Sequence, residues 1–470
     1  MNPSKPPDSD PRPPLVLSPV DTGAFESARR KAFWRLLPLL FISYMIAYVD
    51  RQNVAVAKLT MMHDLPEFDN AVIGFGAGVF FWGYFLLEVP GTLLVERWSA
   101  RKWITRIMFT WGIMAALTAV VRTPMQFYIV RFCLGLAEAG FFPGVIVYLT
   151  HWFTPRDRAR ALATFFVASP LAQIVSPLAS RWLLPIGVDA AGLEKLNMAG
   201  AEPVPAFWGL VGWQWVYILW AIPAILLSVV VFFWLTDRPR QAKWLTPAER
   251  ESLENALENE RLLAAGGKRL TVLQALVHPR VLLLAFAMFC TVTATYAMEF
   301  FMPTILKDWY GLDLNNLTWL IILPPALAMI AQPAVAWSSD HFQERRWHAV
   351  IPLLLAASSM ACLPASRGNL TLTVVLFMLV LAGAKAYMPA FWSLPNLFLT
   401  HAAAAGSIGL INSIGNLGGF CGPAITGAVQ KATGSFNTSL YYLAGSIVVS
   451  ATMIFMIATV CRPGRRDGVG

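Results

Sequence analysis

The chain has 470 residues, of which 57% are hydrophobic and only 13% are charged, and its formal net charge is +9 at pH 7. Soluble domains carry about 25% charged residues, so this composition excludes an ordinary soluble protein and indicates a polytopic membrane protein. None of the five cysteines forms a CxxC pair, and the six histidines form no HxxxH motif. We therefore expect no metal site and no cofactor.

The first residues are polar and rich in proline, without the apolar core of a cleavable signal peptide. We expect residues 1–33 to form a disordered cytoplasmic segment. Twelve apolar stretches follow, each long enough to cross a bilayer as a helix. They cover residues 36–58, 71–94, 103–121, 125–150, 160–183, 213–235, 279–306, 317–339, 348–365, 370–399, 404–430 and 437–461.

The longest hydrophilic connection, residues 236–278, divides these stretches into two sets of six. Within it, Thr246-Pro247-Ala248-Glu249 has the pattern of a helix N-terminus, which predicts an amphipathic linker helix. The expected organisation is a six-helix bundle over 34–235, a second over 279–461 and a cytoplasmic tail over 462–470. The fold class is then an all-α membrane protein.

Basic residues are distributed unevenly between the connections. With a cytoplasmic N-terminus, 26 Lys and Arg residues lie in inside segments and six lie in outside connections. This bias is typical of the positive-inside rule and predicts that both termini are cytoplasmic. The net positive charge is then a feature of topology, so we expect no nucleic-acid partner.

A charged motif occurs once in each half of the chain. The loop after the second stretch begins with Glu96 and Arg97 and continues to Arg101, and the loop after the eighth contains Asp340 and Arg345 in a matching acidic-x4-basic-basic pattern. Two halves that repeat in the same orientation are typical of a two-bundle secondary transporter. We interpret these five residues as gating residues.

Charges of both signs lie inside two apolar stretches. Arg131 precedes Glu138 by two helical turns, so both side chains point to nearly the same face of one helix. The doublet Asp50-Arg51 interrupts the first stretch. A carboxylate at the centre of the bilayer costs roughly 2.5–3.5 kcal/mol on insertion scales, and such charges mark routes for charged solutes or protons.

Several strings in the chain resemble one family of transporters. They are Tyr48-Val49-Asp50-Arg51-Gln52-Asn53, Tyr84-Phe85-Leu86-Leu87-Glu88-Val89-Pro90, Arg131 through Gly144, and Ile411-Asn412-Ser413-Ile414-Gly415-Asn416-Leu417-Gly418-Gly419-Phe420. Together they resemble the anion:cation symporter family of the Major Facilitator Superfamily, which includes bacterial permeases for tartrate, phthalate and hexarates. The resemblance covers residues 34–461 and departs from the superfamily loop pattern at Thr92 and Ser99, where glycine is usual.

The resemblance implies twelve helices in two pseudo-symmetric six-helix bundles and proton-coupled uptake of an organic carboxylate. It further implies a multi-pass protein of the bacterial inner membrane that works as a monomer. In the family, the arginine that matches Arg51 engages the substrate carboxylate. The acids that match Asp50 and Glu138 carry the coupling proton, with Arg131 beside them.

The chemistry of these side chains agrees with those roles. A guanidinium stays charged when it is desolvated and offers a planar fork to a carboxylate, which favours Arg51 as a substrate ligand. Glu138 is favoured as a proton carrier because burial opposes its charged form while a nearby arginine favours it. The alternative is a fixed ion-pair network. Tyr44 and Tyr48 share the helix face of Arg51, so they could line the cavity or pack between helices.

Glu299 and Lys385 carry the opposite charge pattern in the second half of the chain. Arg51 and Glu299 occupy nearly the same position in their respective repeats, as do Glu138 and Lys385. We predict that Glu299 and Lys385 form a pair that lines the cavity, with Lys385 contacting a second anionic group of the substrate and Glu299 taking part in proton coupling. A structural ion pair is the alternative.

Four further polar residues are candidates. Gln173, Asn412 and Asn416 could bind substrate hydroxyl groups or form hydrogen bonds between helices. Glu88, beside Pro90, is interpreted as a gating residue, with a solvated helix end as the alternative.

The sequence therefore predicts proton-coupled symport of a small organic carboxylate, with a hydroxylated dicarboxylate or sugar acid such as tartrate or hexarate favoured. The alternatives are an organic-anion exchanger, an uncoupled facilitator, or a carrier of an aromatic acid such as phthalate. An intramembrane enzyme is disfavoured because no His, Asp and Ser residues have catalytic spacing. A membrane sensor is disfavoured because the chain has no sizeable soluble domain.

Overall fold

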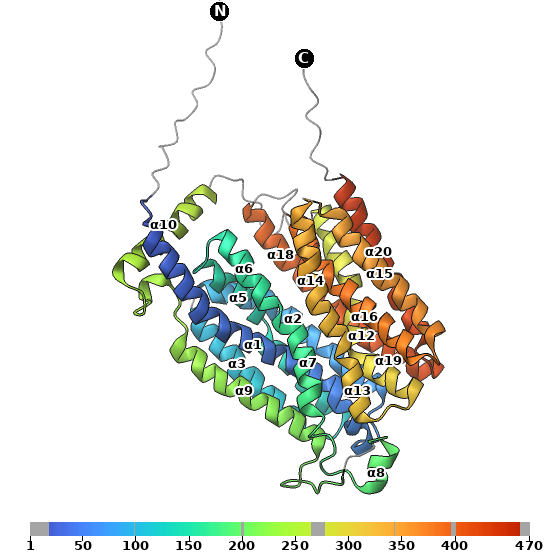
Figure 1. Cartoon of the computed structure of the whole chain (residues 1–470). Coiled ribbons are helices and arrows are strands. Elements are labelled where there is room, and N and C mark those ends of the chain that lie inside the picture. The colour runs from blue at the N-terminus through green and yellow to red at the C-terminus, as the bar shows by residue number, and fades with distance from the viewer. Residues whose placement is uncertain are drawn as a thin grey trace, which may run out of the picture.

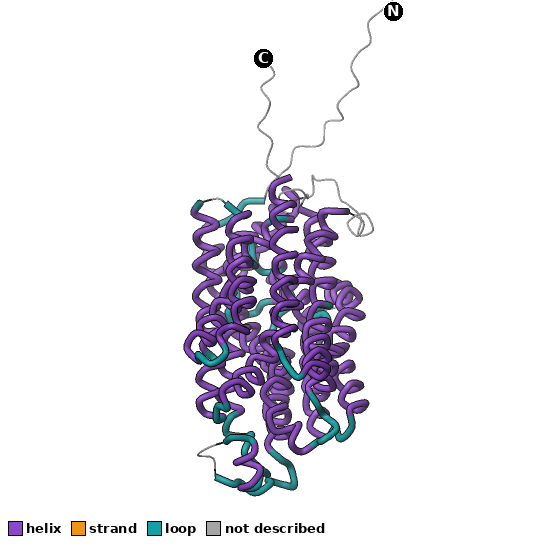
Figure 2. The backbone as a smooth tube through the Cα atoms, turned by 90° about the vertical axis from the view of Figure 1, so that its right-hand side faces the viewer, coloured by secondary structure: helices purple, strands orange, loops and turns teal. Residues whose placement is uncertain are grey.

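The computed structural model describes residues 18–97, 99–198, 202–264, 278–342, 344–395 and 401–460. Over these residues the chain is helical, and the regular elements are α-helices and short 3₁₀ turns (Figure 2). The start of α1 and the end of α20 lie at the same end of the molecule, and helix α8 lies at the opposite end (Figure 1). We call these the terminal end and the distal end.

The first bundle and the linker contain the helices of the N-terminal half. These are α1 (Thr22–Asp64), α2 (Asn70–Arg97), α3 (Ala100–Leu117), η1 (Thr118–Val120), α4 (Pro124–Glu138), α5 (Phe141–Thr150), α6 (Pro155–Phe166), α7 (Ala168–Ser180), α8 (Ala190–Lys195), α9 (Gly212–Trp234), η2 (Pro239–Gln241) and α10 (Pro247–Ala264). Helix α10 is the predicted linker helix. It packs against α1.

The second bundle contains the remaining helices. These are α12 (Pro279–Tyr310), α13 (Leu314–Ile321), α14 (Leu323–His341), α15 (Arg346–Cys362), η3 (Leu363–Ser366), α16 (Leu370–Ala386), α17 (Met388–Ser393), α18 (His401–Asn416), α19 (Gly418–Thr433) and α20 (Asn437–Val460). Among the described residues, 11 helical segments are long and apolar enough to cross a membrane. The twelfth predicted span, 404–430, is covered by α18 and α19.

Two expectations from the sequence are wrong in detail. Residues 22–33 were expected to be disordered, but they form the first turns of α1, because Ser27 Oγ and Lys31 Nζ each lie 2.6 Å from Glu249 Oε1 of α10. The predicted span 125–150 is also not one continuous helix. Gly140 adopts a left-handed conformation, with φ of 82°, between α4 and α5.

The remaining broken spans have a similar form. The predicted spans 160–183, 317–339, 370–399 and 404–430 each consist of two helices joined by a single residue. Breaks of this kind at membrane depth are tolerated where the backbone is buried in protein or lines a cavity. The joining residues in these four spans, Val167, Ile322, Tyr387 and Leu417, keep right-handed helical backbone angles, unlike Gly140.

The hydrophobic core has two parts, and the intramembrane charges lie on the boundary between them. In α1, residues up to Val49 belong to one cluster and residues from Val54 belong to the other. In α4, the boundary falls between Phe127 and Leu134. One cluster joins the terminal half of the first bundle to the linker, and Tyr296 and Phe420 of the second bundle pack against it. The other cluster joins the distal half of the first bundle to the second bundle.

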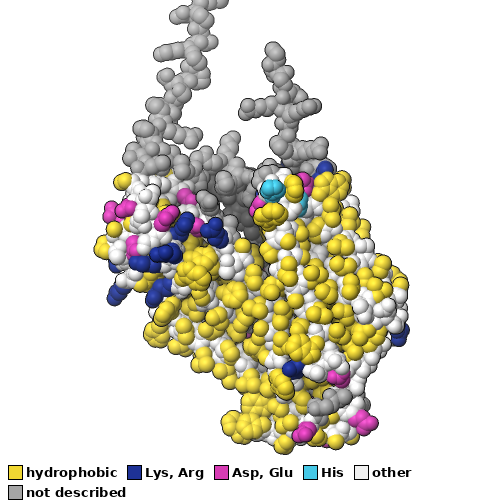
Figure 3. Space-filling view, in the orientation of Figure 1, with side chains coloured by type: hydrophobic (Ala, Val, Ile, Leu, Met, Phe, Trp, Pro, Cys, Tyr) yellow, Lys and Arg dark blue, Asp and Glu magenta, His cyan; other side chains and the backbone are white. Residues whose placement is uncertain are grey.

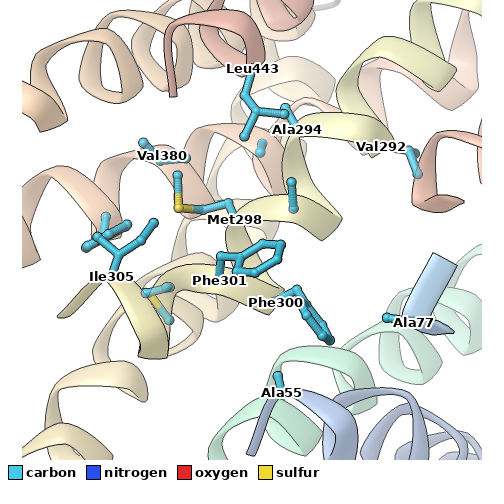
Figure 4. Packing of buried hydrophobic residues seen from close by; sticks show 14 of the residues in the cluster. Ala55, Ala77, Val292, Ala294, Met298, Phe300, Phe301, Ile305, Val380 and Leu443 are labelled. Atoms are coloured by element: carbon cyan, nitrogen blue, oxygen red, sulfur yellow. The ribbon is translucent and has the colours of Figure 1, made fainter. Parts of the chain in front are cut away.

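Side chains of α12 form much of the shared core. Figure 4 shows Phe300 of α12 facing Ala55 of α1 and Ala77 of α2, which belong to the other bundle. Apolar contact is therefore continuous between the bundles in the distal half, and the bundles are closed against each other there.

Polar contacts reinforce this distal closure. Asp69 Oδ2 lies 2.8 Å from Lys431 Nζ, and Arg181 Nη1 donates to Asn315 Oδ1 at 2.9 Å. Helix α2 packs closely on α19, where a Cβ on Gly427 would lie 2.4 Å from the backbone oxygen of Asn70. The closure therefore depends on small residues as well as on polar pairs.

The surface agrees with a membrane position. Hydrophobic side chains cover the middle of the face seen in Figure 3, while Lys and Arg gather towards the terminal end. Phe233 is 78% exposed and Leu226 is 61% exposed, and both lie on α9. Apolar side chains with this exposure belong against lipid in a membrane-spanning bundle.

Candidate functional site

A polar cavity lies between the two bundles, on the terminal side of the distal closure. It is lined from the first bundle by Tyr44, Tyr48, Arg51, Tyr84, Phe142, Phe166, Ser169 and Pro170, and from the second by Met288, Thr291, Val292, Thr295, Tyr296, Gln332, Ala384, Lys385, Tyr387, Met388, Trp392, Asn412 and Asn416. Six of the seven predicted substrate ligands line this cavity, namely Arg51, Tyr44, Tyr48, Lys385, Asn412 and Asn416.

Arg51 of α1 stands between the cavity and Glu138 at the end of α4. Its Nε and Nη2 atoms lie 2.7 and 2.5 Å from the same oxygen, Glu138 Oε1. The Arg51 side chain is 12% exposed, whereas that of Glu138 is 1% exposed. Within the described part of the chain, Glu138 Oε2 is buried without a hydrogen-bond partner. The cation therefore faces the cavity, and the acid lies behind it.

Lys385 of α16 and Glu299 of α12 repeat this arrangement in the second bundle. Lys385 Nζ lies 2.7 Å from Glu299 Oε1, and the two side chains are 14% and 2% exposed. Glu299 also accepts hydrogen bonds from Gln52 at 3.1 Å and from Gln173 at 3.4 Å. The ion pair anticipated from the repeat is thus present, and two amides of the first bundle support its acid.

The ring of Tyr48 lies between the two cations. Arg51 Cζ is 5.7 Å from the ring centroid, and Lys385 Nζ is 5.8 Å from it. The two cations are therefore separated by no more than about twice that distance. Tyr44 extends the aromatic wall, because its ring stacks on Phe165 at 4.2 Å and contacts Tyr48 at 5.7 Å.

Asp50 and Arg131 are buried apart from the cavity lining. Asp50 accepts hydrogen bonds from the indole of Trp111 and, at 3.2 Å, from Asn53. Arg131 lies over the ring of Phe80 at 5.1 Å. Its Nε and Nη1 atoms have no hydrogen-bond partner among the described residues. Neutral donors, not a directly bonded cation, therefore hold Asp50.

For Gln173 and Glu88 the structure distinguishes between the alternatives that the sequence left open. Gln173 does not line the cavity and instead donates to Glu299, which is the interhelical alternative. Glu88 is only 3% exposed, so the solvated helix end is wrong. Asn412 Nδ2 donates to Glu88 Oε1 at 2.5 Å and thereby links α18 of one bundle to α2 of the other.

Two residues of the repeated loops, Arg101 and Arg345, contact acidic side chains. The backbone N–H of Arg101 donates to Asp237 at 2.9 Å, and Arg345 Nη1 lies 2.5 Å from Asp340 Oδ1. The side chains of Glu96 and Arg97 lie outside the described part of the chain.

Several lining residues were not found by sequence reasoning. Tyr296 receives a long hydrogen bond of 3.5 Å from Arg51 Nη1, and Tyr84 lies under the Arg51 guanidinium at 5.1 Å. Tyr296 precedes Glu299 by three residues on α12, so its helical phase carried the signal. Gln52 was contained in a family-like string, but nothing in the sequence placed it against Glu299.

The arrangement of these side chains suits reversible binding of an anion more than catalysis of a covalent reaction. Among the described residues, no group of three or more His, Cys, Asp and Glu side chains could hold a metal ion. Two cavity-facing cations, each backed by a buried acid, can exchange that acid for an anion from solution.

Comparisons with known proteins identify the family. The family model of the Major Facilitator Superfamily matches residues 40–423. A protein of Agrobacterium vitis named "Putative tartrate transporter" is 40% identical over 430 residues, covering 91% of each chain. The "Putative metabolite transport protein NicT" of Pseudomonas putida is 36% identical, covering 94% of this chain and 97% of the relative.

Solved structures agree on the fold. A partially occluded inward open conformation of the xylose transporter XylE from E. coli superimposes with a TM-score of 0.68 at 14% sequence identity, covering 91% of this chain and 98% of the other. The chain therefore belongs to the Major Facilitator Superfamily and is a membrane transport protein, not an enzyme.

Proposed function

We propose that this protein carries out proton-coupled uptake of a small organic carboxylate by alternating access, and that its substrate is a hydroxylated dicarboxylate or sugar acid such as tartrate or a hexarate. The observation that carries the proposal is the Arg51–Glu138 pair, in which the cation faces the cavity and the acid is buried behind it. Relatives named as tartrate transporters, at 40 and 41% identity, support the substrate class.

The pair couples substrate to proton through one shared cation. A substrate carboxylate that docks on the Arg51 fork competes with Glu138 for the guanidinium. Glu138 would then be a buried charge without its cation, which is strongly unfavourable, so it takes up a proton. When substrate leaves, the proton leaves and the pair forms again. Within the first bundle, Asp50 is proposed to share this coupling proton with Glu138, and Arg131 supports both acids electrostatically.

The second bundle contributes the remaining contacts. Lys385 would bind the second anionic group of the substrate, since it faces the same cavity and flanks the same tyrosine ring as Arg51. Asn412 and Asn416 carry amides that suit hydroxyl groups between the two carboxylates. A dicarboxylate that bridges the bundles in this way fits a site at the interface of two repeats.

We propose that the conformation with the distal closure is one stage of this cycle. Because the bundles are joined at the distal end and the cavity lies on the terminal side, this conformation receives or releases substrate at the terminal end. We assign that end to the cytoplasm of a bacterial cell, in accordance with the predicted topology. Glu88 and Asn412 would act as a link that parts or tightens when the bundles rock.

An aromatic carboxylate is a second candidate substrate. Tyr44, Phe142, Phe166 and Trp392 give the cavity an aromatic wall that would stack on a flat ring. The carboxylate would still dock on Arg51, so this candidate changes the substrate class without changing the coupling.

Purified protein in proteoliposomes tests the proposal. An acid exterior should drive accumulation of tartrate or of an aromatic acid above its outside concentration, with acidification of the lumen. Arg51→Lys, which keeps the charge but loses the fork, should lower uptake at least tenfold. Arg122→Lys, at an exposed connection, is the matched control. Anion-for-anion exchange without proton movement would contradict the proposal.

A further inference from the structure

We propose that Glu299 is a second proton site, located in the second bundle, and that the protein moves a dicarboxylate with two protons, one for each substrate carboxylate. The inference rests on the proposed function and adds a stoichiometry and a residue that carries it. It follows from the number of cavity-facing cations and from what lies behind each of them.

The two ion pairs share one geometry. In each, the cation is 12–14% exposed and the acid is 1–2% exposed. An anion in the cavity can therefore reach Arg51 and Lys385 but not Glu138 and Glu299. A substrate with one carboxylate can take one cation, whereas a dicarboxylate that reaches both takes two and leaves two buried acids without their partners.

Charge balance then sets the number of protons. Arg51, Arg131 and Lys385 are balanced by Asp50, Glu138 and Glu299 in the empty site. A docked dianion adds two negative charges to this buried group, and two protons restore neutrality. An uncompensated charge in such surroundings is strongly unfavourable, so a dianion should not cross with its charge unbalanced.

The surroundings of Glu299 suit a site that must exist in both protonation states. The groups that face it are Lys385 from α16, Gln52 from α1 and Gln173 from α7. Arg51 and Arg131 line a small void with it, and each has its own acid nearby. A glutamine amide contains a donor and an acceptor, so after rotation Gln52 or Gln173 can accept from protonated Glu299.

Two substrates that differ in one chemical group distinguish the contribution of the Arg51–Glu138 pair from that of the Lys385–Glu299 pair. Tartrate and threonate have the same carbon chain and hydroxyl groups, but threonate carries a CH₂OH group where tartrate has its second carboxylate. The proton-to-substrate ratio is measured in proteoliposomes of the wild-type protein by balancing opposed substrate and pH gradients. We expect two protons per tartrate and one per threonate, with tartrate uptake insensitive to membrane potential.

Variants test whether Glu299 is the second site. Glu299→Gln should lower the tartrate ratio to one and make tartrate uptake sensitive to membrane potential. The double variant Glu299→Gln/Lys385→Gln, which removes the pair without stranding a charge, should retain one proton per threonate and lower tartrate uptake at least tenfold. Glu67→Gln, at an exposed loop, is the matched control and should keep the tartrate ratio of two.

Specific outcomes would overturn the inference. They are one proton per tartrate in the wild type, two protons per tartrate in Glu299→Gln, or loss of both substrates in the folded double variant. If the wild type shows no acid-driven uptake of either acid, the proposed function fails and the inference fails with it. A wild-type ratio of one for both acids contradicts the inference alone.

Discussion

The two ion pairs of the cavity resemble each other in exposure but differ in how their acids are held. Glu138 receives two contacts from one guanidinium on a single oxygen, and its other oxygen is buried without a hydrogen-bond partner among the described residues. Glu299 receives one ammonium and two neutral amides. If its cation is removed, Glu138 therefore loses the hydrogen bonds described above, whereas Glu299 keeps its two hydrogen bonds from glutamine amides. We infer that coupling is stricter at the first pair.

Loss of Arg51 should have the largest effect. Arg51→Ala removes the carboxylate fork and leaves Glu138 as an unpaired buried charge, so tartrate uptake should fall at least 100-fold and stability by about 3–5 kcal/mol. The double variant Arg51→Ala/Glu138→Gln should recover stability without recovering uptake. Uptake assays and thermal unfolding would measure the two effects. Recovery of uptake together with stability would contradict the ligand role of Arg51.

Neutralising Glu138 should separate binding from coupling. Glu138→Gln keeps a side chain of similar shape but cannot release a proton, so exchange of internal for external tartrate should persist. Accumulation driven by a pH gradient should fall at least tenfold. Counterflow and gradient-driven uptake in the same vesicles would measure both. Accumulation at the wild-type level would refute the coupling role.

Loss of Lys385 should have a smaller effect that depends on the substrate. Lys385→Ala removes the second cation, so the KM for tartrate should rise about tenfold, which corresponds to roughly 1.4 kcal/mol. The KM for threonate, which has no second carboxylate, should change less than threefold. An unchanged KM for tartrate would mean that Lys385 only pairs with Glu299.

The sequence anticipated the pairs but not their surroundings. Helical spacing, the resemblance and the offset between the repeats placed Arg51, Glu138, Glu299 and Lys385 in the site. These signals depend on position along one chain and on its internal repeat. The contacts of Glu299 with Gln52 cross between bundles, and neither periodicity nor charge count contains that information.

The fold, too, was predicted where it depends on local sequence and missed where it depends on backbone conformation or distant contacts. Hydropathy located the membrane spans, because apolar length is a local property of the sequence. It did not show that Gly140 divides one span, nor that residues 22–33 continue α1. The first depends on a single backbone conformation, and the second depends on Glu249 of a distant helix that binds Ser27 and Lys31.

The ion pair Lys31–Glu249 lies outside the membrane, and its loss should have the smallest effect on stability. It therefore serves as a reference for the two ion pairs of the cavity. Burial of Glu249 opposes its ionisation, but hydrogen bonds from Lys31, Ser27 and the backbone of Thr246 outweigh this and lower its pKa to about 2. Because the pKa is lower in the folded protein, the stabilisation is present above the unfolded pKa near 4.3 and is lost as pH falls towards 2.

Glu249→Gln should therefore lower stability at neutral pH by about 1 kcal/mol or less, since Lys31 is largely solvated. The difference from the wild type should vanish in strong acid, and tartrate uptake at neutral pH should be unchanged. Thermal unfolding over a pH series would show this. A loss of stability as large as that caused by Arg51→Ala would mean that the buried ion pairs of the cavity contribute no more than this exposed-end pair.

The central claim is that a docked carboxylate takes the cation and the buried acid takes a proton. Purified protein in weakly buffered solution tests this without any membrane gradient. Addition of tartrate should draw protons from the solution, and Glu138→Gln should reduce the number taken up by about one per bound tartrate. Tartrate binding to the wild type with no proton uptake would contradict the account.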